Sequence, residues 1–218
     1  FSGCSKLTTL DVSNFDTSNV TDMSSMFSSC SSLTSLNVSN FDTNKVTNMA
    51  SMFDGCSSLT SLNVSNFDTS QVTSMHGMFS SCSSLTTLDL SYFDTSKVTN
   101  MAYMFDGCSK LTTLDVSNFD TSKVKDMESM FSSCSSLTNL KLCSFDTFNV
   151  TYMRRMFQYT KKLTKIYVGS NWTTENVKYS SYMFNSSGVS SVTQSNNCEI
   201  DAEDKSVSLN ATSTTNSI

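Results

Sequence analysis

Apolar and polar positions along this chain repeat with a period of 26 residues. In the first unit, the apolar positions are Leu7, Leu10, Val12, Phe15, Val20, Met23, Met26, Phe27 and Cys30. The same residue types return in six regular copies, which begin at Leu7, Leu33, Leu59, Leu85, Leu111 and Leu137. A seventh copy begins at Leu163 and places Trp172 at the phenylalanine position, and Val189 and Val192 hint at an eighth. A period of this length indicates units that stack against their neighbours to bury a shared core.

The first half of each unit predicts a short strand. Leu10 and Val12 flank a polar residue, which is the alternation of a half-buried strand. Asp16 and Thr17 follow the strand, and the pair recurs in all six regular copies. We expect this pair to form a turn and to cap the segment after it, because side-chain oxygens accept hydrogen bonds from free backbone N–H groups.

The second half of each unit predicts a short α-helix or 3₁₀ segment, because its apolar residues lie three or four apart. The predicted fold is an α/β repeat solenoid of 26-residue units. Each unit consists of a short parallel strand, an Asp-Thr turn and a helical segment. We expect the solenoid to cover residues 1–192 and residues 193–218 to form a polar tail, a linker or a C-terminal cap.

The repeat also resembles a known family. Residues 7–12 follow the pattern LxxLxL, and residues 30–43 with Val46, Met49, Met52 and Phe53 carry the rest of the motif. Over residues 1–185 the copies resemble the BspA-like leucine-rich-repeat proteins of bacterial and some protist cell surfaces. The resemblance implies a leucine-rich-repeat-like, right-handed solenoid outside the cell that attaches to host proteins, matrix or other cells. It implies no catalytic residues, no cofactor and no shared ligand site.

Composition narrows the classes of function. The net charge is −5 and the isoelectric point about 4.7, which argues against a general nucleic-acid binder. No apolar run approaches 18 residues, so we expect no membrane insertion. Because Phe1 lies inside the repeat pattern, we interpret the chain as a monomeric part of a longer extracellular protein.

The cysteines lead to two expectations. Six of them share the 26-residue spacing: Cys4, Cys30, Cys56, Cys82, Cys108 and Cys134. Zinc sites need ligands two to four residues apart, so this spacing favours a buried column of thiols rather than metal sites. Cys143 and Cys198 lie outside that column and could pair if the tail folds back on the last strands.

Two regions are candidate binding surfaces. The predicted strands present a polar ladder that includes Asp89, Asp115 and Lys141; it either binds a partner or is simply solvated. Residues 139–178 hold seven basic and two acidic residues, a net +5 that leaves −10 for the rest of the chain. Tyrosines gather in the same region, which indicates either an interface for an acidic protein or polysaccharide, or a divergent terminal cap. The candidate ligand-binding residues are Asp89, Asp115, Lys141, Arg154, Arg155, Lys165 and Tyr167.

Other chemistry has weaker support. His76 is the only histidine and lies in a column of variable residues, so we do not expect catalysis. The Asp42-Thr43 pair and its equivalents could suggest calcium, but one Asp per unit fits a turn better. Regular hydroxyl ladders also raise an ice-binding or mineral-binding alternative. The leading hypothesis is a non-enzymatic adhesion module that binds a protein or glycan, and the rival is a structural spacer that holds another domain away from the cell.

Overall fold

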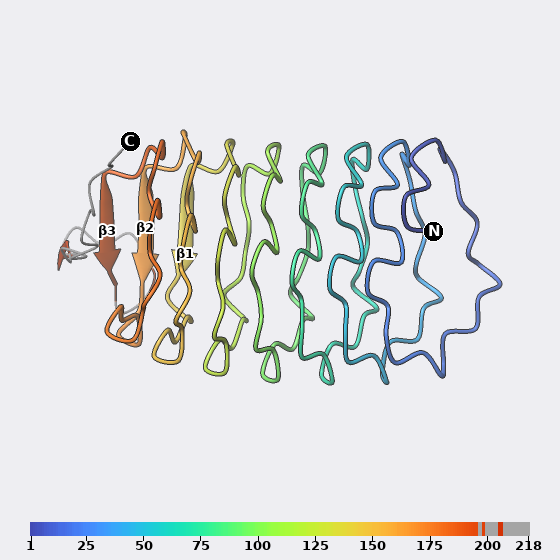
Figure 1. Ribbon diagram of the computed structural model, residues 1–218, viewed down its shortest axis with the longest axis horizontal. Helices are drawn as coiled ribbons and strands as arrows, with labels where there is room; N and C mark the ends of the chain where they lie inside the picture. Colours follow the sequence, from blue (N-terminus) through green and yellow to red (C-terminus); the bar gives the residue numbers. More distant parts are fainter. Residues whose placement is uncertain (196–197, 199–204, 207–218) are drawn as a thin grey trace.

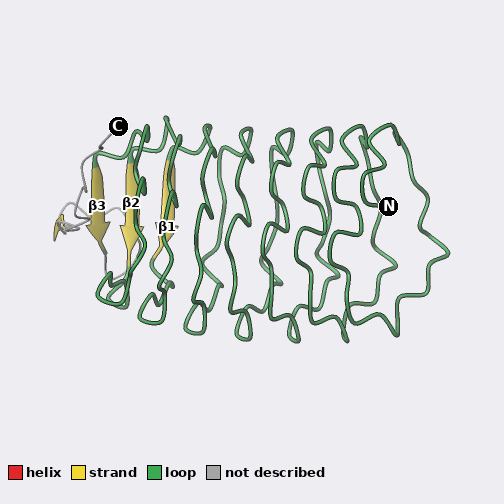
Figure 2. Ribbon diagram, viewed as in Figure 1, coloured by secondary structure: helices red, strands yellow, loops and turns green. Residues whose placement is uncertain are grey.

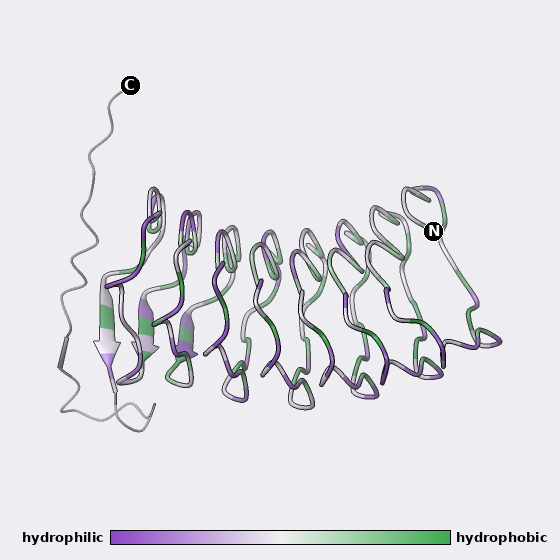
Figure 3. Ribbon diagram, turned by 60° about the horizontal axis from the view of Figure 1, so that its bottom comes forward, coloured by the Kyte–Doolittle hydropathy of each residue, from purple (hydrophilic) through white to green (hydrophobic). Residues whose placement is uncertain are grey.

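The computed structural model describes residues 1–195, 198 and 205–206. Successive units lie side by side as coils of a stack, from the N-terminal to the C-terminal end (Figure 1). Figure 3 shows apolar and polar segments recurring at the same place in successive coils. The prediction of a repeat stack is therefore confirmed for this part of the chain. We call the residues of positions 8–13 and their equivalents the strand side, and those of positions 22–30 the turn side.

The strand side forms a sheet only in the last coils (Figure 2). The strands are β1 (Asn139–Leu142), β2 (Lys165–Val168), β3 (Ser191–Gln194) and β4 (Lys205–Ser206). β1, β2 and β3 are parallel neighbours, and β4 is antiparallel to β3. In copies 1 to 5 the equivalent segments lie in the same place without forming strands. The strand prediction thus holds for the C-terminal copies alone.

The turn side contains no helix, so the helical part of the prediction is wrong for the described residues. Two positions per copy adopt a left-handed backbone instead, as at Ser25 (φ 55°) and Ser29 (φ 59°). Each is the third residue of a tight turn, in which the N–H of Met26 donates to the oxygen of Met23 and that of Cys30 to the oxygen of Phe27. Consecutive turns of this kind also place side chains three and four residues apart on the same side, which explains the apparent helical stripe.

Hydrogen bonds on the turn side run between copies rather than along one helix. The N–H groups of Met23, Ser25, Phe27 and Ser29 donate to carbonyls of the next copy over 2.6–3.0 Å. Four equivalent bonds join every pair from copy 1 to copy 7. A helix would have used these N–H groups internally, so the stack replaces helical bonds with bonds to its neighbour.

The core lies between the two sides and consists of columns of identical residues. The rings of Phe27, Phe53, Phe79, Phe105, Phe131, Phe157 and Phe184 stack in order, with neighbouring centroids 5.4–6.0 Å apart. Met49, Met75, Met101, Met127 and Met153 fill a second column and are fully buried. Each copy therefore completes the burial of the copy before it, as expected for a repeat that cannot fold alone.

The Asp-Thr pair has a different role from the predicted helix cap. The Asp does form the turn: Asp94 Oδ1 accepts from the N–H of Ser96 at 2.9 Å. The Thr connects copies, because the buried Thr95 hydroxyl donates to the carbonyl of Asp120 and accepts from its N–H. The turn is thus confirmed, and the cap is replaced by a buried threonine ladder between coils.

The predicted boundary at residue 192 falls within a strand. Thr193 and Gln194 continue β3, so the sheet extends two residues into the segment expected to be a tail. Cys198 and β4 also belong to that segment and pack at the end of the stack. The rest of the predicted tail lies outside the described residues.

Candidate binding surfaces

A groove lies on the strand side of copies 3 to 6. Its volume is about 960 Å³, within the range of ligand-binding clefts. Most of its lining residues are polar, and most come from the same three positions of successive copies: Ser61, Leu62, Asn63, Thr87, Leu88, Asp89, Thr113, Leu114, Asp115, Asn139 and Lys141. Ser117 adds to the lining, and Cys143, Ser144 and Cys198 form its C-terminal end. Three sequence-predicted site residues, Asp89, Asp115 and Lys141, therefore line one groove.

Most of the groove lies over copies whose strand side forms no sheet. Leu62, Leu88 and Leu114 are each 8% exposed, whereas Leu140 of β1 is 1% exposed and Ile166 of β2 is fully buried. Once β1 and β2 pair, the coils close over the leucine column. The groove therefore lies over copies without strands and ends at β1, whose Asn139 and Lys141 belong to its lining.

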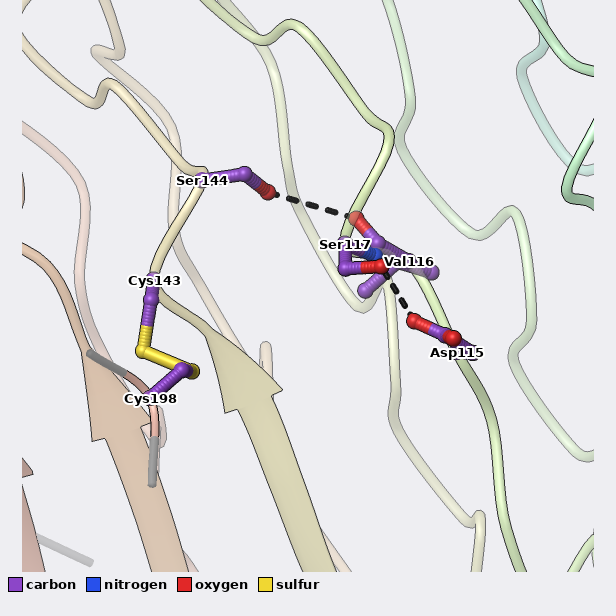
Figure 4. Close-up of a disulfide and its surroundings, with 6 residues drawn as sticks. All are labelled: Asp115, Val116, Ser117, Cys143, Ser144 and Cys198. Atoms are coloured by element: carbon purple, nitrogen blue, oxygen red, sulfur yellow. Dashed lines mark hydrogen bonds between the residues drawn. A yellow bond between two sulfur atoms is a disulfide. The ribbon is translucent and has the colours of Figure 1, made fainter.

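The carboxylates in the groove are held in place by their own turns. Oδ1 of Asp89 accepts from the N–H of Ser91 at 3.0 Å, and Oδ1 of Asp115 from that of Ser117 at 2.9 Å (Figure 4). These bonds lower the pKa of both side chains, because they favour the charged form; Lys141 lowers that of Asp115 further. Each carboxylate is thus ionised at neutral pH.

A disulfide closes the C-terminal end of the groove. Cys143, directly after β1, is bonded to Cys198, with Cα atoms 5.8 Å apart (Figure 4). The pairing that the sequence left open is therefore present. It ties the segment after β3 to the strand two copies earlier, and this is the part of the strand side in which the sheet is formed.

The periodic cysteines form the expected column of thiols. Cys30, Cys56, Cys82, Cys108 and Cys134 are fully buried and unpaired, while Cys4 is exposed at the N-terminal end. Each buried thiol lies 3.0–3.2 Å from the carbonyl of a phenylalanine 29 residues earlier, as Cys56 does with Phe27. Burial raises the pKa of the Cys56 thiol to about 12, so it stays protonated at neutral pH.

The basic, aromatic region forms a second surface on the turn side of copies 6 and 7. Tyr152 and Tyr179 stack with ring centroids 4.7 Å apart and are 39% and 47% exposed. Arg155 lies over the ring of Tyr182 at 5.9 Å, and Nε of Arg154 donates to the hydroxyl of Ser181 at 3.1 Å. We call these five side chains (Tyr152, Arg154, Arg155, Tyr179 and Tyr182) the tyrosine–arginine patch.

The seven predicted site residues therefore do not form one site. Asp89, Asp115 and Lys141 line the groove, and Lys165 is exposed on the adjacent β2. Arg154 and Arg155 lie on the turn side, on a separate ladder of the coil. Tyr167 is only 3% exposed, so its side chain is part of the packed interior rather than a free surface.

His76 lies in a shallow hollow of about 240 Å³ on the turn side, with Ser51, Asp54, Ser80 and Tyr103 in its lining. Its ring contacts the edge of Tyr103 at 5.4 Å. No hydrogen bond of its imidazole to a described nucleophile or carboxylate is found. In the described residues there is also no group of three or more His, Cys, Asp and Glu side chains that could hold a metal ion.

Sequence reasoning missed one ladder of polar contacts. Nδ2 of Asn66 donates to the carbonyls of Val38 and Phe41 in the previous copy, and Asn40 and Asn118 make equivalent bonds. This position directly precedes the phenylalanine of each unit. Its recurrence as Asn was the available signal. These bonds satisfy carbonyls at the bend after the strand side.

The family of the chain follows from its repeat sequence. Residues 1–91 and 83–197 match the model of the family described as "Mycoplasma protein of unknown function, DUF285". The chain belongs to this family. The two matches cover the whole stack of this DUF285 chain. No curated protein and no solved structure matches it. The part of this DUF285 chain that the structure describes has no helix with the length and apolarity needed to span a membrane.

Proposed function

We propose that this chain is a non-enzymatic ligand-binding module of a surface protein, that its stack is a right-handed, BspA-like leucine-rich-repeat solenoid, and that the strand-side groove holds its ligand. The groove is the observation that carries the proposal. Its volume is about 960 Å³, and its walls bear charges of both signs. A protein segment or a glycan with hydroxyl and charged groups fits these walls.

Two further features support presentation outside the cell. The Cys143–Cys198 disulfide belongs to an oxidising environment, because cytosolic thiols are normally kept reduced. The exposed face of the stack is dominated by serine, threonine and asparagine, whereas the apolar residues are internal columns. Such a stack offers a long, regular surface for attachment to host proteins, matrix or other cells.

The test uses residues that the repeat itself supplies. Asn63 occupies the position of Asp89 and Asp115 in an earlier copy, and its Oδ1 accepts from the N–H of Ser65 at 3.0 Å. Asp89→Asn with Asp115→Asn therefore preserves the turns and removes only the charges. Wild-type protein should bind saturably to at least one member of an array of matrix proteins and glycans. The double variant, and separately Lys141→Asn, should weaken that binding about tenfold or more.

The rival function is a spacer that holds another domain away from the cell. The unbroken turn-side ladder favours it, because four hydrogen bonds between every pair of copies make a continuous rod. A spacer would show no saturable binding to matrix proteins, glycans or cells. Binding that is equal in wild type and in the groove variants would place the ligand elsewhere on the surface.

A further inference from the structure

We infer that the tyrosine–arginine patch on copies 6 and 7 is a second binding surface, separate from the groove, and that it binds a carboxylate-rich segment of another protein. The inference does not depend on the proposed role of the groove. It rests on unneutralised charge, on the way the rings are presented and on a comparison with the same positions in the other copies.

The two guanidinium groups are oriented but not neutralised. Arg154 is held by the Ser181 hydroxyl through Nε, which leaves its two terminal nitrogens unbonded to described residues. Arg155 is held by the ring of Tyr182. No salt bridge to a described carboxylate neutralises either group. Oriented guanidinium groups with free terminal nitrogens bind carboxylates with paired hydrogen bonds.

Each tyrosine ring of the patch has one face covered by another side chain of the patch. The planes of Tyr152 and Tyr179 differ by 9°, so each covers a face of the other along the stack. One face of Tyr182 lies beneath Arg155. Sugar rings bind aromatic side chains through an open ring face, whereas carboxylates accept hydrogen bonds from tyrosine hydroxyls and guanidinium groups. The oriented guanidinium groups and the exposed tyrosines fit the carboxylates of an acidic peptide.

The other copies show that the stack does not require these side chains. Arg154 and Arg155 stand where copy 2 has Ala50 and Ser51 and where copy 3 has His76 and Gly77. Arg155 also has a left-handed backbone (φ 56°), a conformation that disfavours bulky side chains. Arg155 is therefore expected to lower the stability of the stack relative to a small residue at this position. A role in binding explains why a large residue is present. Exposed tyrosine with arginine is also the typical composition of protein interfaces.

The experiment uses Arg154→Ala with Arg155→Ser, which recreates the pair found in copy 2. The probe is a fluorescent poly-L-glutamate peptide, followed by fluorescence anisotropy at two salt concentrations. Wild-type protein should bind the probe saturably, and the double variant should bind it about tenfold or more weakly. Asp89→Asn with Asp115→Asn should bind it at least as tightly as wild type, because the groove is a different surface.

Three outcomes would overturn the inference. One is equal affinity of the wild type and the double variant for the peptide. Another is tighter binding of a polygalacturonate of matched charge, which would assign the patch to a glycan. The third is a concentration-dependent dimer in sedimentation that the double variant abolishes, which would make a second copy of the chain the occupant. If the double variant unfolds, Arg154→Glu replaces it, because copy 5 already has a glutamate, Glu128, at the same position. This substitution reverses the charge and should abolish peptide binding.

Discussion

The turn side and the strand side of the same coils are held together differently. On the turn side, four backbone hydrogen bonds join each pair of copies from the first to the seventh. On the strand side, a sheet forms only in β1, β2, β3 and β4, and the earlier copies leave a groove above their leucine column. Nearly identical units thus give a turn side that is hydrogen-bonded throughout and a strand side that forms a sheet only at the C-terminal end.

The difference shows that the stack continues through copies whose strand side forms no sheet. The turn side holds the phenylalanine, methionine and cysteine columns, all fully buried in the central copies. Because these columns lie on the turn side, the strand side can leave a groove that presents polar groups to a ligand. The sheet appears where the Cys143–Cys198 disulfide adds a cross-link to the strand side.

The largest expected effect comes from a cavity in the turn-side core. Phe105→Ala removes a fully buried ring that stacks between Phe79 and Phe131, and it should lower the free energy of unfolding by about 3–5 kcal/mol. Leu114→Ala, on the groove side of the same coil region, should cost less, since Leu114 already borders solvent. Urea unfolding of both variants measures the difference. Equal losses would contradict a division of labour between the two sides.

The next effect concerns the closed end of the strand side. Cys143→Ser with Cys198→Ser should lower the free energy of unfolding by about 2–4 kcal/mol, because the disulfide restricts the unfolded chain. Amide exchange should accelerate in β1, β2 and β3 and remain unchanged on the turn side of copy 4. A thiol count on the wild-type protein in denaturant tests the disulfide directly. Six of the eight cysteines should react before reduction. A count of eight would refute the disulfide.

A smaller loss is expected from the threonine ladder. Thr95→Val keeps the shape of the side chain but leaves the N–H and carbonyl of Asp120 without the partner they share. Since unmet hydrogen bonds in a buried site are costly, the expected loss is about 1–3 kcal/mol. Thr99→Val, at an exposed position, is the control and should have little effect. Thermal unfolding of the two variants compares them directly, and similar losses would show that burial of the ladder does not matter.

The smallest effects depend on pH and have opposite signs at two aspartates. Burial raises the pKa of Asp106, so its contribution to stability is present below about pH 4 and is lost as the pH rises through its folded value. Asp106→Asn should therefore stabilise the protein at pH 7 and give no gain at pH 3.

Hydrogen bonds from Ser96 lower the pKa of Asp94, so its contribution is present above about pH 4 and is lost as the pH falls. Asp94→Asn should destabilise the protein at pH 7 and have a diminishing effect toward pH 3. Unfolding curves at the two pH values test both variants. The same sign for both would contradict the assignment of Asp106 to a half-buried site and Asp94 to an exposed turn.

Much of this arrangement could be predicted from the sequence. The spacing of the cysteines predicted a buried thiol column, and the spacing of the phenylalanines predicted core columns, because both are properties of a period. The helix was predicted wrongly for an equally physical reason. Residues three and four apart share a face both in a helix and in consecutive turns. A single unit does not reveal whether Met23 and Phe27 donate their N–H groups within the unit or to the next copy.

The sequence predicted which residues could bind a ligand, but it did not predict which surface of the stack each of them lies on. Lys141 and Arg154 are both in the basic region, yet one lies in the groove and the other on the turn side. Tyr167 follows the same column as Asp115 and Lys141, but its side chain is only 3% exposed, whereas that of Lys141 is exposed. Position in a repeat fixes the column of a residue, whereas exposure depends on how closely the coils approach at that copy.

The sequence by itself determined the stack: its period, its number of coils, its core columns and its charged, aromatic end. These follow from residue spacing, since apolar residues that recur at a fixed interval have to be buried against one another. Only the tertiary structure decided which side of the coil closes, where the groove opens and which candidate residues share a surface. Those features depend on hydrogen bonds and a disulfide between residues 25 to 55 positions apart, and no local pattern specifies such contacts.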